Sequence, residues 1–511
     1  MKTGNLAFRK FQLAAVLTIA LFAVATILFA QSAPKRNGPD DKPATVSKLD
    51  AEQIQIDLDK ATALDLPYAT NDLTAVSFVT PDDKEGWVMR IPGSRPIATP
   101  AYADGMIFVG GGYGSHEFYA IDAETGRVVW QMKTQDDGPT AAVVEDGYVA
   151  FNTESCTVIV AEAKTGKVIW QEWLGDPLMS QPAISQGRLY IAYPGGQRGA
   201  QAQNNSAQTD SSNLGPGHRM LCADLKTGRH IWEQKIDADV ISAPVVSGDQ
   251  VLFTCFDGMS FCLDASTGAV VWKKENGGTS APLVAGGHVV ITSKETKDGQ
   301  AYEGLKRLEL KGGEERDRVM LARGKADYLK ENKGGGVAIS SNETIKLDSS
   351  VGFSSAPSAA KLAVANQHIG ISTVVGAWAY QGSRAVYRNG QMMNAQGKYL
   401  NSIKAGDGKF AWRAEVKGKG IGEDTQVFSS PALGERNLYL CGVRGHLVAV
   451  KQQDGALAFA YALKQPMAFQ PALAKGAIYA GTVNGLLICL KTGDEDADGW
   501  YAWGGNAQHN K

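Results

Sequence analysis

The chain has 511 residues, of which 44% are hydrophobic and 20% are charged, and its formal net charge is −2. This balance is ordinary for a folded protein, and the lack of a basic excess excludes a general nucleic-acid binder. The 58 glycines show no collagen-like period, so they favour many tight turns and therefore many short strands.

The first segment, residues 1–33, is typical of an export signal. Basic residues precede a mostly apolar run from Phe11 to Ala30, and Ala30-Gln31-Ser32 places small residues where a signal peptidase would cleave. The run is also just long enough to span a bilayer. Two interpretations of this segment therefore stay open, a cleaved signal peptide and a retained membrane anchor. Both predict that the protein is exported. The polar leader that follows, residues 34–84, predicts a short helix from about Lys48 to Ala63, capped by Ser47.

Four near-copies of one phrase reveal how the next part is organised. "AETGRVVW" ends at Trp130, "AKTGKVIW" at Trp170, "LKTGRHIW" at Trp232 and "ASTGAVVW" at Trp272. The first two tryptophans lie 40 residues apart, and so do the last two. A period of about 40 in a sequence of β type is typical of propeller blades.

A second marker, an apolar stretch interrupted by a glycine turn, lies upstream of each copy of this phrase. The marker occurs eight times in the chain, and its weakest occurrence starts at Ser383. We therefore expect an all-β, eight-bladed β-propeller of four-stranded blades over residues 85–494. In each blade the Thr-Gly pair turns the third strand into the fourth, and the tryptophan packs between neighbouring blades, because a lone blade cannot bury both faces. These structural repeat residues are Trp87, Gly126, Trp130, Gly166, Trp170, Gly228, Trp232, Gly268, Trp272, Gly408 and Trp412.

The two ends of the repeat region differ from the pattern. The last blade starts at Gln470 and lacks an ordinary fourth strand, whereas "KEGWVMRI" at Lys84–Ile91 resembles the glycine- and tryptophan-containing neighbourhood of one. We predict that this N-terminal strand closes the eighth blade. The aromatic tail, residues 495–511, is expected to pack against the outside of the ring, with ligand stacking as the alternative.

Three insertions, about 194–217, 293–304 and 324–381, fall in connections that share one face of a propeller. We predict that this face binds partners, since loops on a rigid scaffold commonly carry function; tolerated decoration is the alternative. The candidate residues in its turns are Glu154, Cys156, Asp257, Arg444 and Asn484.

The cysteines and histidines give no clear catalytic pattern. Six cysteines in an exported chain permit disulfides, but Cys255 should face Ser260, two residues out of register with Cys262, which disfavours a bridge. Cys222, Cys262 and Cys489 share one strand slot and are expected to be buried. Cys156 is either a turn residue or a reactive thiol. No His-Glu-x-x-His, Cys-x-x-Cys or haem-attachment motif occurs.

The pattern Ala-x-Asp-x-x-Thr-Gly-x-x-x-Trp is complete at Ala120–Trp130 and close at Val160–Trp170, Cys222–Trp232 and Cys262–Trp272. Over about residues 85–494 it resembles the repeat of the pyrroloquinoline-quinone-like (PQQ-like) propellers. In one branch, the quinoprotein alcohol dehydrogenases, the resemblance implies a quinone and calcium in the central funnel, often beside a disulfide between adjacent cysteines. This chain has no adjacent cysteine pair. The chain is also similar to the other branch, that of BamB, a non-enzymatic propeller of outer-membrane β-barrel assembly. It differs from that branch because it has no lipid-anchor cysteine and carries larger insertions.

We therefore interpret the chain as an exported, non-catalytic scaffold that binds protein partners and no cofactor, in the periplasm or at the outer membrane of a Gram-negative-type bacterium. Its only expected membrane contact is the N-terminal anchor. Two alternatives stay open, a PQQ- and calcium-dependent dehydrogenase and a sensor of small ligands or glycans. The sequence does not indicate an oligomeric state.

Overall fold

The computed structural model describes residues 53–322 and 384–506, with gaps at 113, 137, 154–155, 176–179, 196–216, 237, 239, 241, 256, 298–299, 406 and 423–424. These residues belong to one compact unit, residues 44–511. The predicted export segment and nearly all of the insertions at 194–217 and 324–381 lie outside the described residues. Within the described part, no helix is long and apolar enough to cross a membrane.

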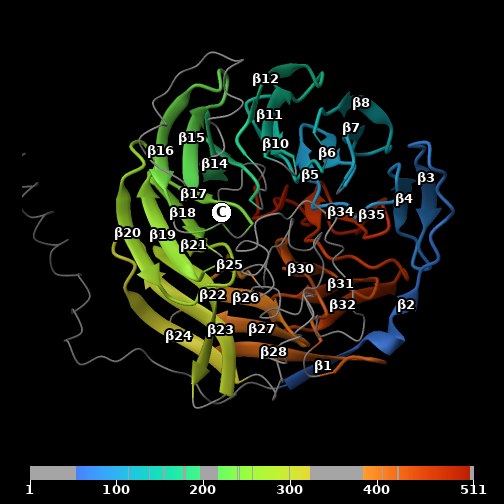
Figure 1. The fold of residues 1–511 in the computed structure, drawn as a ribbon. Helices are drawn as coiled ribbons and strands as arrows, with labels where there is room; N and C mark the ends of the chain where they lie inside the picture. Colours follow the sequence, from blue (N-terminus) through green and yellow to red (C-terminus); the bar gives the residue numbers. More distant parts are fainter. Residues whose placement is uncertain are drawn as a thin grey trace, which may run out of the picture. The chain divides into compact units, whose positions relative to one another are not determined.

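Eight sheets surround a common centre and form an eight-bladed propeller, which confirms the predicted fold (Figure 1). Blades 1 to 4 each have four antiparallel strands, ordered from the centre outward as they follow in the chain. Blade 1 contains β5 (Ala101–Ala103), β6 (Met106–Gly110), β7 (Glu117–Asp122) and β8 (Val128–Lys133). Blade 2 contains β9 (Val143–Glu145), β10 (Tyr148–Asn152), β11 (Thr157–Glu162) and β12 (Val168–Trp173). Blade 3 contains β13 (Ala183–Ser185), β14 (Arg188–Gly195), β15 (Gly217–Asp224) and β16 (His230–Lys235). Blade 4 contains β17 (Val245–Ser247), β18 (Gln250–Thr254), β19 (Met259–Asp264) and β20 (Val270–Glu275).

Blades 6, 7 and 8 include strands from the N-terminal leader, whereas blade 5 does not. Blade 5 contains β21 (Leu283–Ala285), β22 (His288–Lys297), β23 (Gln300–Glu309) and β24 (Glu315–Ala322). Blade 6 contains β25 (Val386–Arg388), β26 (Gln391–Gln396), β27 (Tyr399–Lys404), β28 (Phe410–Lys417) and β1 (Gln53–Asp57). Blade 7 contains β29 (Ala432–Leu433), β30 (Asn437–Cys441), β31 (His446–Lys451), β32 (Leu457–Ala462) and β2 (Thr62–Ala63). Blade 8 contains β33 (Ala472–Ala474), β34 (Ala477–Gly481), β35 (Leu486–Lys491), β4 (Glu85–Arg90) and β3 (Val76–Val79).

The leader closes the ring as predicted but does not form the predicted helix. β4 pairs antiparallel with β35, with Trp87 opposite Cys489, so the N-terminal strand completes blade 8. Residues 53–63, which cover most of the predicted helix, instead form β1, a 3-10 turn at Leu58–Lys60 and β2. The reason lies in the apolar period, because Ile54, Ile56 and Leu58 alternate with polar residues and all face the core. An alternation of two specifies a strand with one buried face.

Six interfaces between blades use the same contact. In the first, the indole N–H of Trp130 donates to the carbonyl of Ala163 in blade 2 at 2.9 Å, and its ring packs so closely on Gly166 that a Cβ there would lie 2.7 Å from it. Gly166 has a φ of +73°, so glycine is required both for the turn and for the close approach. The corresponding donors are Trp87, Trp170, Trp232, Trp272 and Trp412, and the glycines they contact are Gly126, Gly228, Gly268, Gly313 and Gly455.

Blade 5 lacks this tryptophan. Asp317 occupies its place in the repeat and binds Arg307 on the neighbouring strand (Nε to Oδ1, 2.7 Å). Gly408, the turn glycine of blade 6, keeps the left-handed φ of +69°. A cavity of about 290 Å³ lies between these two blades, lined by His288, Arg316 and Met392 among others. The absence of one indole therefore leaves an open space between blades 5 and 6.

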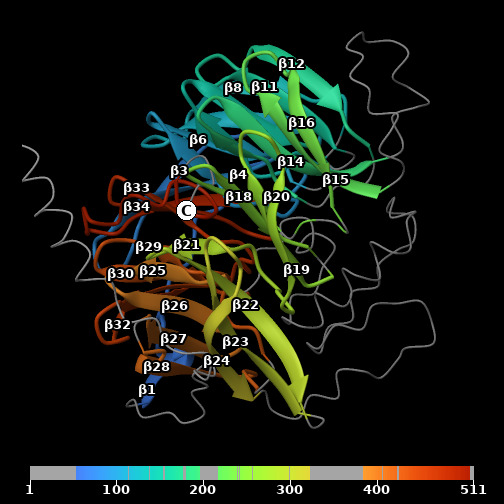
Figure 2. The same ribbon diagram turned by 90° about the vertical axis from the view of Figure 1, so that its left-hand side faces the viewer.

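The predicted insertion at 293–304 is mostly regular structure. β22 and β23 continue as one hairpin to the pair Lys297 and Gln300, so the segment lengthens the blade. The hairpin of β14 and β15 is also long, ending at the pair Gly195 and Gly217. Figure 2 shows the ends of both hairpins on the same side of the ring. We call this side the hairpin face, and the turns between the first and second strands of each blade lie on the opposite face.

Candidate functional site: the channel and the hairpin face

The C-terminal tail enters the centre of the propeller, so its expected position on the outside of the ring is wrong. It starts at the face opposite the hairpin face, where the N–H of Gly476 donates to the carbonyl of Ala497 at 3.1 Å. It then pairs with two inner strands, through Trp500 with Leu473 of blade 8 and through the carbonyl of Tyr501 with the N–H of Tyr102 of blade 1 (2.6 Å). The tail thus follows the inner wall of the ring.

Trp503 fills the middle of the channel. Its side chain is fully buried and packs with Ala243 and Ala281, which lead into the inner strands of blades 4 and 5. The guanidinium of Arg384, just before blade 6, lies 5.1 Å from the indole ring, and the N–H of Gly504 donates to the side chain of Gln470, just before blade 8 (3.2 Å). Residues of blades 4, 5 and 6 therefore surround the Trp503 side chain, and blade 8 holds the backbone beside it, so the tail fills the channel at this level.

The guanidinium of Arg384 makes a hydrogen bond and an aromatic contact within this plug. Burial lowers the pKa of Arg384 to about 9, so the group still carries its charge at neutral pH. Its Nε donates to the carbonyl of Pro282 at 3.1 Å, and the indole face of Trp503 offers a cation–π contact, which is stronger when water is excluded. The buried cation therefore gives the aromatic ring at position 503 a favourable partner.

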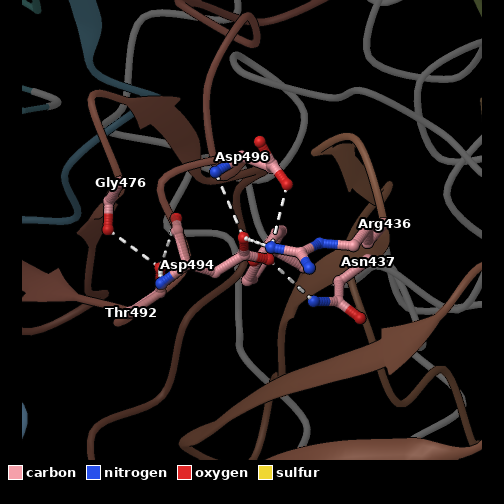
Figure 3. Close-up of polar contacts among 7 residues, drawn as sticks. Arg436, Asn437, Gly476, Thr492, Asp494 and Asp496 are labelled. Atoms are coloured by element: carbon pink, nitrogen blue, oxygen red, sulfur yellow. Dashed lines mark hydrogen bonds and ion pairs between the residues drawn. The ribbon is translucent and has the colours of Figure 1, made fainter.

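A polar cluster directs the tail from the last strand into the channel (Figure 3). Asp494 accepts hydrogen bonds from Arg436 (2.7 Å) and Asn437 (3.1 Å) of blade 7 and from the backbone N–H of Asp496 (3.1 Å). Thr492 donates to the carbonyl of Gly476 at 2.9 Å. Burial would raise the pKa of Asp494, but the hydrogen bond and charge of Arg436 hold it below its ordinary value. The cluster fixes the turn after β35 and joins blades 7 and 8.

The candidate residues of the hairpin face do not converge on one point. Asp257, Arg444 and Asn484 are exposed, each in the turn between the second and third strands of a different blade. Arg444 donates to the carbonyl of Lys419 (3.1 Å). Cys156 is fully buried at a φ of +56°, and Glu154 lies outside the described residues. The three exposed members therefore lie in the turns of three different blades, 4, 7 and 8.

The cysteines do not form a reactive or bridged site. All six lie within the described residues, all are buried, and no disulfide joins them. Burial raises the pKa of Cys222, Cys262 and Cys489 to about 12, which suppresses the thiolate. The register differs by one residue from the prediction, since Thr254 and not Cys255 faces Ser260.

The channel does not fit a quinone with calcium. The space that a funnel-bound quinone would need contains the buried Trp503 and Arg384. Among the described residues, no three His, Cys, Asp or Glu side chains lie together in a way that could hold a metal ion. Sequence reasoning missed that the tail fills the channel. The aromatic composition of the tail was the signal in the sequence that could have indicated this position.

The fold and its repeated tryptophan contacts define an eight-bladed propeller of PQQ-like repeats. The chain belongs to the family described as outer membrane protein assembly factor BamB, whose model matches residues 71–197, 194–330 and 377–503. It is 20% identical over 278 residues to BamB of Nitrosomonas eutropha, covering 48% of this chain and 65% of that protein. It is 27% identical over 149 residues to the quinoprotein alcohol dehydrogenase PedH of Pseudomonas putida, covering 26% of this chain and 24% of that protein.

One solved structure supports the fold alone. The computationally designed protein Ika8 superposes with a TM-score of 0.51 at 12% identity, covering 78% of this chain and 96% of that one. Each of the two sequence alignments spans less than two thirds of the relative's own length.

Proposed function

We propose that this protein is an exported, non-catalytic scaffold that binds protein partners during the assembly of outer-membrane proteins. The observation that carries the proposal is the filled channel in a chain of the BamB family, because Trp503 occupies the place where an enzyme of this fold would need its funnel. Partner binding then takes place on the outer surfaces of the propeller. The proposal includes a periplasmic or outer-membrane location, which the same family membership supports.

The hairpin face is the part of the surface that we assign to partners. The hairpins of blades 3 and 5 project from it (Figure 2). The exposed Asp257, Arg444 and Asn484 lie in turns on the same face. Propeller scaffolds use such loops because the ring holds them rigidly in place. Binding there needs no movement of the channel plug.

Site-specific photo-crosslinking of the full chain in its own cells tests the proposal. A photoreactive amino acid at Asn484 reports on the hairpin face, and the same amino acid at the exposed Asp146, in the turn between β9 and β10, reports on the opposite face. We expect an adduct with a subunit of the outer-membrane assembly machinery from position 484 only. Equal adducts at both positions, or none at 484, contradict the proposal, as would calcium-dependent PQQ binding with dye reduction by the purified protein.

A further inference from the structure

The leader demonstrates that the outer edge of a blade accepts an added strand. β1 pairs in parallel with β28, with Gln53 opposite Arg413. β2 pairs in parallel with β32, and β3 pairs antiparallel with β4. An edge strand presents unpaired backbone N–H and C=O groups, which are a template for another strand. The chain uses this template on three of its own blades.

The added segments also cover the tryptophan contact beside them. Ile54 of β1 lies against Gly455, on which Trp412 packs, and Ala75 lies against the equivalent contact of Trp87. The covered tryptophans are 3% and 4% exposed. Because β1 alternates apolar and polar residues, one face of it fills the groove between two blades while the other faces solvent.

The equivalent grooves of blades 1 and 2 are uncovered in the part of the chain that the structure describes. β8 and β12 are the last strands of their sheets, and no described strand pairs with their outer edges. Trp130 and Trp170 are partly exposed, and so are Gly166 and Gly228, on which they pack. These grooves offer the features that the leader covers elsewhere.

The inward hydrogen bonds show which backbone groups face the open edges. The N–H of Leu174 donates to the carbonyl of Cys156, just before β11, at 2.9 Å, and the N–H of Thr134 donates to the carbonyl of His116, just before β7, at 2.8 Å. Bonded residues alternate along an antiparallel pair. The N–H groups of Gln171 on β12 and Gln131 on β8 therefore point outward, next to the two partly exposed tryptophans.

We propose that the outer edges of β8 and β12, with Trp130 and Trp170, form a docking site for an extended segment of a partner chain that carries an apolar residue at every second position. The segment adds a fifth strand to blade 1 or blade 2, as β1 does to blade 6, and its apolar side chains lie over the tryptophans. The docking site rests on the proposed function. Its partner is an extended, not yet folded segment of a client protein that forms a β-strand when it binds. Main-chain hydrogen bonds give such binding its affinity, and alternate side chains give its specificity.

The test uses the full chain and a labelled peptide with the sequence of residues 51–60, AEQIQIDLDK, followed by fluorescence anisotropy. Prolines replace both outward N–H groups in the variant Gln131→Pro/Gln171→Pro, since proline is tolerated on an edge whose N–H faces solvent. The matched control is Lys273→Pro at the same position of β20, where the neighbouring Trp272 is only 6% exposed. We expect the double variant to bind at least about tenfold more weakly and the control to bind within about twofold of the unaltered chain.

A second probe needs no change in the protein. The same peptide, N-methylated at alternate residues, keeps its side chains but cannot form the ladder, and we expect its binding to be lost. Equal binding of both peptides, unaltered binding by the double variant, or no binding by the unaltered chain would overturn the docking site. Those results leave the crosslink at Asn484 unaffected, so a failure of the docking site and a failure of the proposed function are distinguishable.

Discussion

Replacing Trp503 with alanine tests the channel plug most directly. The side chain is fully buried, and replacing a buried tryptophan by alanine generally costs about 3–5 kcal/mol. Loss of the cation–π contact with the buried Arg384 would add up to about 2 kcal/mol. The cost cannot exceed the free energy with which the tail docks, because the tail can detach while β4 still closes the ring. We therefore expect a loss of about 4 kcal/mol.

Thermal unfolding of the full chain measures this loss. With an unfolding entropy of about 2 cal/mol/K per residue over a propeller of about 400 residues, 4 kcal/mol corresponds to a fall in Tm of about 5 °C. Trp503→Phe should recover about half of it, since phenylalanine keeps an aromatic face for the guanidinium. Tyr68→Ala is the control, because Tyr68 is 81% exposed and should shift the Tm by less than about 1 °C.

An unchanged Tm for Trp503→Ala would refute the reasoning. It would mean that the tail contributes nothing to the folded state and that the channel is open in solution. The channel would then have room for a quinone, as the quinone-dependent alternative requires. Titration with PQQ and calcium would become the next measurement.

Three further predictions follow from the repeat, the tail and the buried thiols. Gly166→Ala should destabilise the protein by several kcal/mol more than Gly147→Ala in chemical denaturation, because both residues have positive φ but only Gly166 meets an indole, that of Trp130. Asp494 has a pKa below its ordinary value of 3.8, so it stabilises the fold above that pH and the stabilisation is lost as the pH falls below it; Asp494→Asn should flatten this acid limb in pH-dependent melts. Cys262, whose pKa is raised to about 12 by burial, should react with iodoacetamide about a thousandfold more slowly in the native protein than in urea.

The ring could be predicted from the sequence because its signals are local and repeated. Asp122 accepts hydrogen bonds from the N–H and hydroxyl of Thr125 at 2.8 and 2.7 Å, so the Asp-x-x-Thr turn is stabilised within five residues. The closing strand at Lys84–Ile91 could be found because it carries the tryptophan of a fourth strand at the other end of the repeat region, where the last blade lacks one. Periodicity therefore predicts blades reliably wherever each copy contains its own turn.

The errors lie where tertiary contacts decide between equivalent patterns. The tail is aromatic whether it packs outside the ring or inside it, and only the arrangement of Ala243, Ala281 and Arg384 around the channel selects the inside. The register of the β18–β19 hairpin differed because the N–H of Cys255 bonds to the carbonyl of Met259 (2.8 Å), which makes the turn longer than two residues. The candidate binding residues remain a prediction, since no sequence pattern shows what approaches an exposed rim.

The two ends of the chain restrict where a partner can bind. The leader covers the outer edges of blades 6, 7 and 8, and the tail fills the channel from the face opposite the hairpins. Both use apolar side chains to fill grooves that the repeat itself leaves open, Ile54 beside Trp412 and Trp503 beside Arg384. Any repeated blade creates such a groove, so grooves without a covering segment should be the ones kept for other molecules. Within the described residues, blades 1 to 5 carry no added strand at their outer edges. Among them, the partly exposed Trp130 and Trp170 single out blades 1 and 2, and these edges together with the hairpin face are the surfaces that we assign to partners.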